Sequence, residues 1–243
     1  MPKLRDGTRT SDARLSRVAW YDEHSRRYPI RELLDPDRPL ANKTWPCALV
    51  LDQQHQGACT GFAVTHALAA APDPQRGPFD EAFARETVYW EAQKLDPFEG
   101  GAYPGASRHM AGGSLLAAAK VLRARALIHE YRWAFDLDEV LQTLAQLGPV
   151  VLGLPWYEGM SEPACCGMLH PTGRRKGAHA VLARGIDVDR QTVLVHNSWG
   201  REWGTGGTAL IHWQDLASLL HRTKDAEACV LLKQPVEARG TPA

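Results

Sequence analysis

The chain lacks an excess of charge of either sign, and it lacks long apolar runs. Its 243 residues carry 28 basic and 28 acidic side chains, so the formal net charge is zero. This balance argues against a protein that binds nucleic acid, because such proteins carry net positive charge or a basic face. The longest apolar stretches, such as residues 149–154, are far shorter than the roughly 20 residues that cross a bilayer. We therefore expect neither a nucleic acid nor a membrane as partner.

Cysteine is also scarce, with five residues, which are Cys47, Cys59, Cys165, Cys166 and Cys229. A secreted scaffold held by disulfides uses more cysteines in even number, so we expect reduced thiols. No apolar run follows the basic residues near the N-terminus, as a secretory signal would require, and we expect a cytoplasmic location. The adjacent pair Cys165 and Cys166 has the wrong spacing for a metal site, and no second pair exists. We expect no metal and no organic cofactor.

The first 44 residues differ in character from the rest. They are polar, charged and interrupted by Pro29, Pro36 and Pro39. They predict an arm on the surface, with a short helix near residues 30–34. The remaining residues, 45–243, contain enough apolar side chains for a core and form the predicted catalytic domain.

Hydrophobic spacing divides this domain into a helical half and a strand-rich half. The predicted helices cover residues 59–71, 80–94, 114–122, 137–147 and 213–221. The predicted strands cover residues 150–154, 179–185, 192–196, 208–212 and 229–232. We predict an α+β fold with a helical lobe at about 45–135 and an antiparallel, barrel-like β-rich lobe at about 136–243.

Four polar residues are spaced as a thiol active site requires. Cys59 begins a predicted helix, where unpaired amides and the helix dipole favour a thiolate. Gln53 lies in the preceding loop and offers a side-chain donor for an oxyanion. His179 and Asn197 lie in the strand-rich half and supply a base and a residue to orient it.

The segments around these residues resemble the papain family of cysteine peptidases. Residues 52–63 are similar to the family's nucleophile segment, with Gln53 as the oxyanion glutamine and Cys59 as the nucleophile. Residues 177–181 resemble the segment around the catalytic histidine, His179. The block Asn197-Ser198-Trp199-Gly200, with Trp203 and two later glycines, matches the family's asparagine block. The resemblance covers about residues 45–230 and is similar to compact bacterial and phage-type members without a large propeptide.

The resemblance implies a two-lobed fold with the active-site cleft between the lobes, and a peptide or protein substrate. It implies acyl transfer through a thioester, with Cys59 and His179 as an ion pair and Asn197 holding the imidazole. The substrate-binding positions that it implies are Gly112, Gly113, Ala178 and Trp199. The family's disulfide is missing, because Gln56 and Met110 occupy the positions of its two cysteines.

Three alternatives remain open. An amine instead of water could resolve the thioester, which would make the chain a transamidating acyl transferase. A catalytically silent binding module could keep the same fold. Residues 1–40 could act as a partial lid on the cleft. In addition, the basic run Arg174-Arg175-Lys176 lies just before His179. It is either a solvated loop or a group of charges that attracts acidic residues of a substrate.

Overall fold

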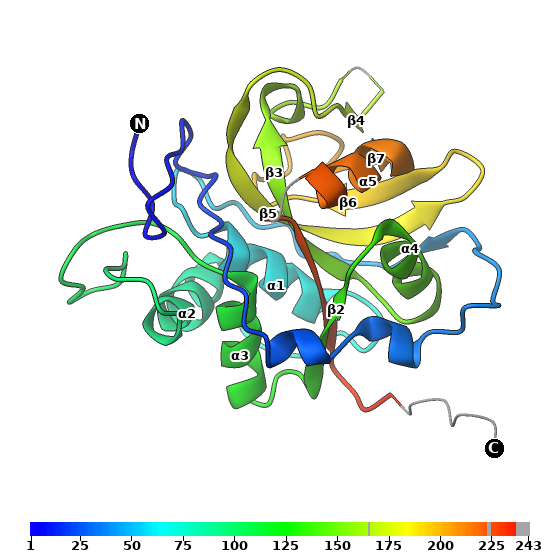
Figure 1. The fold of residues 1–243 in the computed structure, drawn as a ribbon, viewed down its shortest axis with the longest axis horizontal. Coiled ribbons are helices and arrows are strands. Elements are labelled where there is room, and N and C mark those ends of the chain that lie inside the picture. Colours follow the sequence, from blue (N-terminus) through cyan, green and yellow to red (C-terminus); the bar gives the residue numbers. More distant parts are fainter. Residues whose placement is uncertain (165, 223–224, 237–243) are drawn as a thin grey trace.

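A mixed β-sheet forms the frame of the computed structural model, which describes residues 1–164, 166–222 and 225–236 (Figure 1). The strands are β1 (Lys43–Thr44), β2 (Glu130–Ala134), β3 (Val150–Tyr157), β4 (Met168–Leu169), β5 (Arg175–Asp187), β6 (Thr192–His196), β7 (Thr208–His212) and β8 (Glu227–Leu232). Their order is β2-β8-β3-β5-β6-β7-β4, with β1 paired to β5. Only β4 and β7 are parallel among the described strand pairs.

The central strands bury both of their faces, which explains their nearly continuous apolar sequences. Leu152 of β3 and Val181 of β5 belong to one core, whereas the adjacent Val151 and Leu182 belong to the other. Successive side chains of a strand point to opposite faces, so alternate residues of the same strand fill the two cores.

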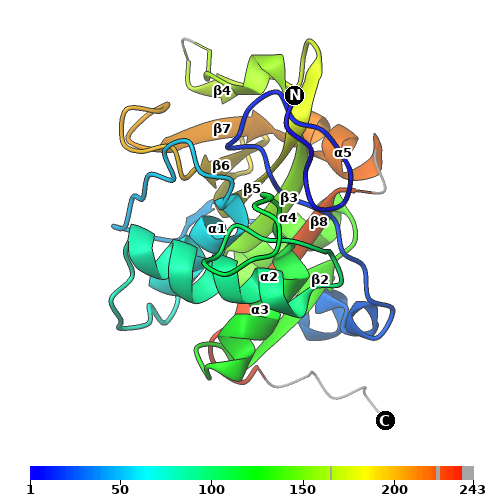
Figure 2. The same ribbon diagram turned by 90° about the vertical axis from the view of Figure 1, so that its left-hand side faces the viewer.

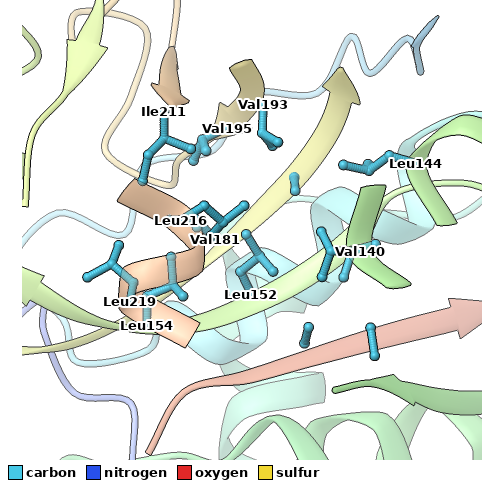
Figure 3. Close-up of a cluster of buried hydrophobic side chains, with 14 of the residues drawn as sticks. Val140, Leu144, Leu152, Leu154, Val181, Val193, Val195, Ile211, Leu216 and Leu219 are labelled. Carbon is cyan, nitrogen blue, oxygen red and sulfur yellow. The ribbon is translucent and has the colours of Figure 1, made fainter. Parts of the chain in front are cut away.

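Helices cover both faces of this sheet. They are α1 (Cys59–Ala69), α2 (Glu91–Leu95), α3 (Leu115–Ala124), α4 (Leu137–Gln146) and α5 (Trp213–Arg222), and a π-helical segment, Phe83–Trp90, leads into α2. Figure 3 shows Val140 and Leu144 of α4 and Leu216 of α5 around Val181 on one face. Helices α1 and α3 contribute to the core on the other face. No helix in the described ranges is long and apolar enough to span a membrane.

Side-chain caps begin two of these helices, close to the starts that the sequence predicts. Ser114 accepts a hydrogen bond from the backbone N–H of Ala117 at the start of α3. Asp136 accepts one from the N–H of Glu139 at the start of α4. Both side chains satisfy an amide that the first helical turn leaves unpaired.

The N-terminal arm is not the surface segment that its polar sequence predicts. Leu15 and Ile30 are fully buried and belong to the core that contains β3 and β5. A 3-10 helix at Ile30–Leu33 confirms the predicted short helix. Figures 1 and 2 show the arm, in blue, running along the boundary between helices α1–α3 and the sheet.

The predicted α+β class is confirmed, but the lobe boundary lies elsewhere. Residues 130–134 lie in the range predicted for the helical lobe, where no strand was predicted, yet they form β2, which pairs with β8 from Glu130↔Leu232 to Ala134↔Ala228. It therefore belongs to the sheet. The sheet is open and not closed as a barrel, because in the described part of the chain its end strands β2 and β4 do not pair with each other.

Candidate active site

Cys59 lies at the first residue of α1, as predicted. Its side chain is 1% exposed, and no side chain caps this helix end. The close approach of α1 to the π-helical segment depends on Gly61, because a Cβ there would collide with the carbonyl oxygen of Ala84. The sequence thus places a buried thiol at a helix N-terminus whose amides point toward the site.

His179 and Asn197 form a direct hydrogen bond. His179 Nε2 lies 2.7 Å from Asn197 Oδ1, and the N–H of Ser198 donates to the same oxygen at 2.8 Å. An oxygen that already accepts from Ser198 requires His179 Nε2 to carry its proton. The other ring nitrogen, Nδ1, therefore keeps a lone pair. It forms no hydrogen bond of ordinary geometry within the described residues, although the Arg14 backbone lies close enough to the ring to raise the pKa of His179.

Two tryptophans pack against the His179 imidazole, and a third packs behind one of them. The ring centroids of Trp156 and Trp199 lie 4.8 Å and 4.9 Å from that of His179, and Trp203 packs against Trp199 at 5.8 Å. His179 and Trp156 are fully buried. These rings exclude water from the bond between His179 and Asn197, which strengthens it.

Gln53 is held between the Asn197 segment and the arm. Its Oε1 accepts a hydrogen bond of 2.6 Å from Ser198 Oγ, which fixes the orientation of the amide. Its Nε2 donates to the carbonyl of Arg14 at 3.2 Å and to that of Gln56 at 2.6 Å. Ser198 was not predicted as a site residue, although it lies inside the predicted asparagine block.

The arm lies between the predicted helical lobe and the predicted strand-rich lobe. The Ser16 carbonyl accepts from the N–H of Gly113 at 3.2 Å, and the Val18 N–H donates to the Gly113 carbonyl at 2.9 Å. On the other side, the Arg17 N–H donates to the Ala178 carbonyl at 3.1 Å. Residues 16–18 therefore form a short strand between the lobes and bind both.

The predicted substrate-binding residues contact this arm. Gly113 and Ala178 pair with it, and the Arg14 guanidinium lies 3.9 Å from the ring centroid of Trp199. Gly112 also contacts the arm, since its carbonyl accepts a 3.3 Å hydrogen bond from Arg5 in addition to a 2.7 Å hydrogen bond from Gln93. A Cβ at Gly113 would lie 2.7 Å from Thr60 Oγ1, so this position requires glycine.

Cys59 lies beneath the same strand. Ser16 Oγ is 3.9 Å from Cys59 Sγ. Burial raises the pKa of the Cys59 thiol, and backbone hydrogen bonds from Ala180 and Ser16 oppose this effect. Burial lowers the pKa of His179 to about 4, and the hydrogen bond to Asn197 opposes it. Both shifts favour the neutral thiol and the neutral imidazole while the arm is in place, and they do not favour the predicted ion pair.

Two buried ion pairs anchor the arm, and neither was predicted from the sequence. Arg5 pairs with Asp96 at 2.8 Å, and both side chains are 0% exposed. Arg17 pairs with Glu227 at 3.0 Å, with side chains 1% and 2% exposed. The first anchor joins the arm to the helical lobe and the second joins it to β8.

The remaining cysteines form no metal site in the part of the chain that is described. No group of three or more His, Cys, Asp or Glu side chains gathers there as a ligand set. Cys47, Cys166 and Cys229 are free thiols, and Cys166 is exposed. Cys165, the other member of the adjacent pair, lies outside the described residues.

Comparisons with solved structures show the fold of the chain. A solved structure of xylellain, a cysteine protease from Xylella fastidiosa, matches with a TM-score of 0.66 and 17% identity, over 93% of this chain and 98% of that one. The chain has the papain-like fold. The same papain-like fold is found in a digestive procathepsin L2 proteinase from the larval midgut of Tenebrio molitor, with a TM-score of 0.51 and 17% identity, over 95% of this chain and 78% of that one.

Sequence comparison is more distant. No protein-family model matches the chain. A curated uncharacterized peptidase C1-like protein of Acanthamoeba polyphaga mimivirus is 21% identical over 208 residues, which cover 68% of this chain. The chain spans 64% of the length of that relative. The papain-like fold is thus established at low identity, and the activity is a separate inference.

Proposed function

We propose that this chain is a cysteine peptidase that hydrolyses peptide bonds through Cys59, His179 and Asn197. The 2.7 Å contact between His179 Nε2 and Asn197 Oδ1 supports it most, because it leaves Nδ1 as a free base. A single arm strand covers both the Cys59 thiol and the Ala178 carbonyl next to His179. The likeness to xylellain, itself a cysteine protease, favours the same activity.

The proposed reaction gives each of these side chains a role. His179 Nδ1 takes the Cys59 proton, and Sγ attacks the peptide carbonyl. The Gln53 side-chain amide and the Cys59 backbone N–H donate to the resulting oxyanion. When the carbon–nitrogen bond breaks, His179 gives its proton to the departing amine. Water, deprotonated by His179, then attacks the thioester, which releases the acid and restores the thiol.

We further propose that the arm holds this peptidase in a blocked state. The backbone groups of Gly113 and Ala178 that would pair with a substrate are occupied by residues 16–18. The Gln53 side-chain amide, which would donate to the oxyanion, already donates a hydrogen bond to the Arg14 carbonyl. Burial beneath the arm also keeps the thiol and the imidazole neutral, so the arm opposes both binding and activation.

The test compares full-length wild type with Ser16→Trp, since an indole does not fit in the space between Ser16 and Cys59. Ala13→Trp, at an exposed arm position, is the matched control. A mixed peptide library, read by mass spectrometry, should be cleaved by Ser16→Trp much faster than by the other two proteins. Adding Cys59→Ala to Ser16→Trp should abolish cleavage. Cleavage that survives this change, or a Ser16→Trp protein whose Cys59 is readily alkylated while no peptide is cleaved, would contradict the proposed function.

A further inference from the structure

A pocket lies next to Trp199, the residue whose ring packs on the predicted catalytic histidine. Its volume is about 560 Å³, and Trp199 lines it together with Glu162, Glu202 and Ser161. The Trp199 ring packs on His179 with a centroid distance of 4.9 Å. A peptide whose scissile bond lies at Cys59 and His179 would therefore place a neighbouring side chain in this pocket.

The pocket has two acidic side chains without cationic partners. Glu162 and Glu202 are exposed and form no ion pair within the described part of the chain. Two further polar groups in its lining, the Ser161 hydroxyl and the Trp199 indole N–H, lack hydrogen-bond partners there. Trp199 is only 7% exposed, so its N–H is a buried donor without an acceptor.

The chain itself places a cation in this pocket. The Arg14 guanidinium lies 3.9 Å from the Trp199 ring centroid, at the distance of a cation–π contact. Arg14 is neutralised by its own neighbour Asp12, with Nη2 2.7 Å and Nε 3.1 Å from the carboxylate oxygens. The charges of Glu162 and Glu202 therefore remain uncompensated even while the arm is bound.

We propose that this pocket binds the Lys or Arg side chain of a peptide substrate, at one position beside the scissile bond. The inference rests on the proposed peptidase function. A substrate cation stacks on Trp199 as Arg14 does, and it faces Glu162 and Glu202 without an accompanying Asp12. Arg14 of the arm thus resembles the side chain of a substrate at this position. It differs in one respect, because Asp12 neutralises its charge and a substrate has no such neighbour.

The experiment uses the full-length Ser16→Trp protein, in which the cleft is freed. An uncharged host peptide carries one Lys, or one norleucine of similar length, moved one position at a time across the cleaved bond. At one position kcat/KM should be roughly five- to thirtyfold higher for Lys, as expected for two exposed charge pairs and one cation–π contact. Glu162→Gln with Glu202→Gln should remove this preference, and so should high salt.

The matched control is Glu86→Gln with Glu91→Gln, which changes the net charge equally on the helical lobe and should keep the preference. Protection of Cys59 from iodoacetamide by the same peptides measures the pocket without turnover. Equal protection by the Lys and norleucine peptides, or a Lys preference that survives the Glu162 and Glu202 changes, would overturn the proposed pocket. Better protection by the Lys peptide without any cleavage would support the pocket and contradict the peptidase.

Discussion

Gln53 Nε2 donates a 3.2 Å hydrogen bond to the carbonyl oxygen of Arg14, a residue of the chain's own N-terminal arm. The predicted oxyanion donor is thus already bound to a peptide carbonyl. Ser198 Oγ fixes the other end of the same amide at 2.6 Å. A donor that is oriented before a substrate arrives costs little reorganisation during the reaction, which is the condition for strong oxyanion stabilisation.

The first prediction concerns this donor. In the Ser16→Trp background, Gln53→Ala should lower kcat by roughly a hundredfold or more, the usual effect of losing one oxyanion donor. Gln214→Ala, at an exposed position of α5, is the control and should leave kcat unchanged. Steady-state kinetics on one peptide measure both. Equal kcat values in the two variants would remove Gln53 from the reaction.

The second prediction concerns access to the nucleophile. Cys59 is 1% exposed beneath Ser16, so iodoacetamide should label it slowly in wild type and much faster in Ser16→Trp. Ala13→Trp should behave as wild type. In Ser16→Trp, His179→Ala should slow the labelling, since the base that removes the thiol proton is gone. Mass spectrometry locates the label, and equal rates in wild type and Ser16→Trp would show that the arm does not cover Cys59 in solution.

The third prediction concerns the buried pair of Arg17 and Glu227. Arg17→Met alone leaves an uncompensated carboxylate in the core and should destabilise the protein by about 3–5 kcal/mol. Adding Glu227→Leu removes that carboxylate and should restore much of the loss. Urea unfolding of the two variants and wild type measures these free energies. A double variant that is less stable than the single one would show that the ion pair does not act as described.

The fourth prediction concerns acid stability. His66 and His196 stack in the interior with ring centroids 4.2 Å apart, and burial lowers the pKa of His196 to about 4. As the pH falls below about 6.5, His196 therefore binds a proton in the unfolded chain. In the folded chain it stays neutral until the pH approaches 4. Stability should be complete above about pH 6.5 and should fall as the pH drops toward 4. His196 alone accounts for about 2 kcal/mol of this loss at pH 5.

His196→Phe tests this assignment. The variant should lose less stability between pH 7 and pH 5 than wild type, because one of the buried neutral imidazoles is removed. His212→Phe, at an exposed position of β7, should follow the wild-type curve. Urea unfolding at both pH values gives the comparison. Identical losses in wild type and His196→Phe would refute the role of this histidine.

The main-domain elements could be predicted because their patterns are local. The apolar residues that follow Leu137 recur at helical spacing, and the run that begins at Val150 is apolar and β-branched as in a strand. The first segment forms α4 and the second forms β3, as expected. The pairing of His179 with Asn197 was implied by the resemblance to the papain family, and the two residues are 18 positions apart. Prediction was less good for residues 80–94, where a π-helical segment precedes α2 within the expected helix.

The role of the arm could not be read from its sequence, because its partners are far away in the chain. Arg5 and Asp96 are separated by 91 residues, and Arg17 and Glu227 by 210. Leu15 lies between Arg14 and Arg17. Its neighbours do not form the periodic pattern of apolar residues that would predict a core position. The basic run before His179 was similarly ambiguous, and in the structure Arg174 pairs with Glu158 and Arg175 with Asp225. Its attraction for acidic substrates stays a prediction.

The arm strand at residues 16–18 is bonded on one edge to Gly113 and on the other to Ala178. It therefore ties the two lobes together mechanically, in addition to covering the thiol. Displacing it exposes the cleft and at the same time cuts this tie, together with the anchors at Arg5 and Arg17. The form with the arm displaced should consequently hold its two lobes together less firmly than the form with the arm bound. It should also unfold faster.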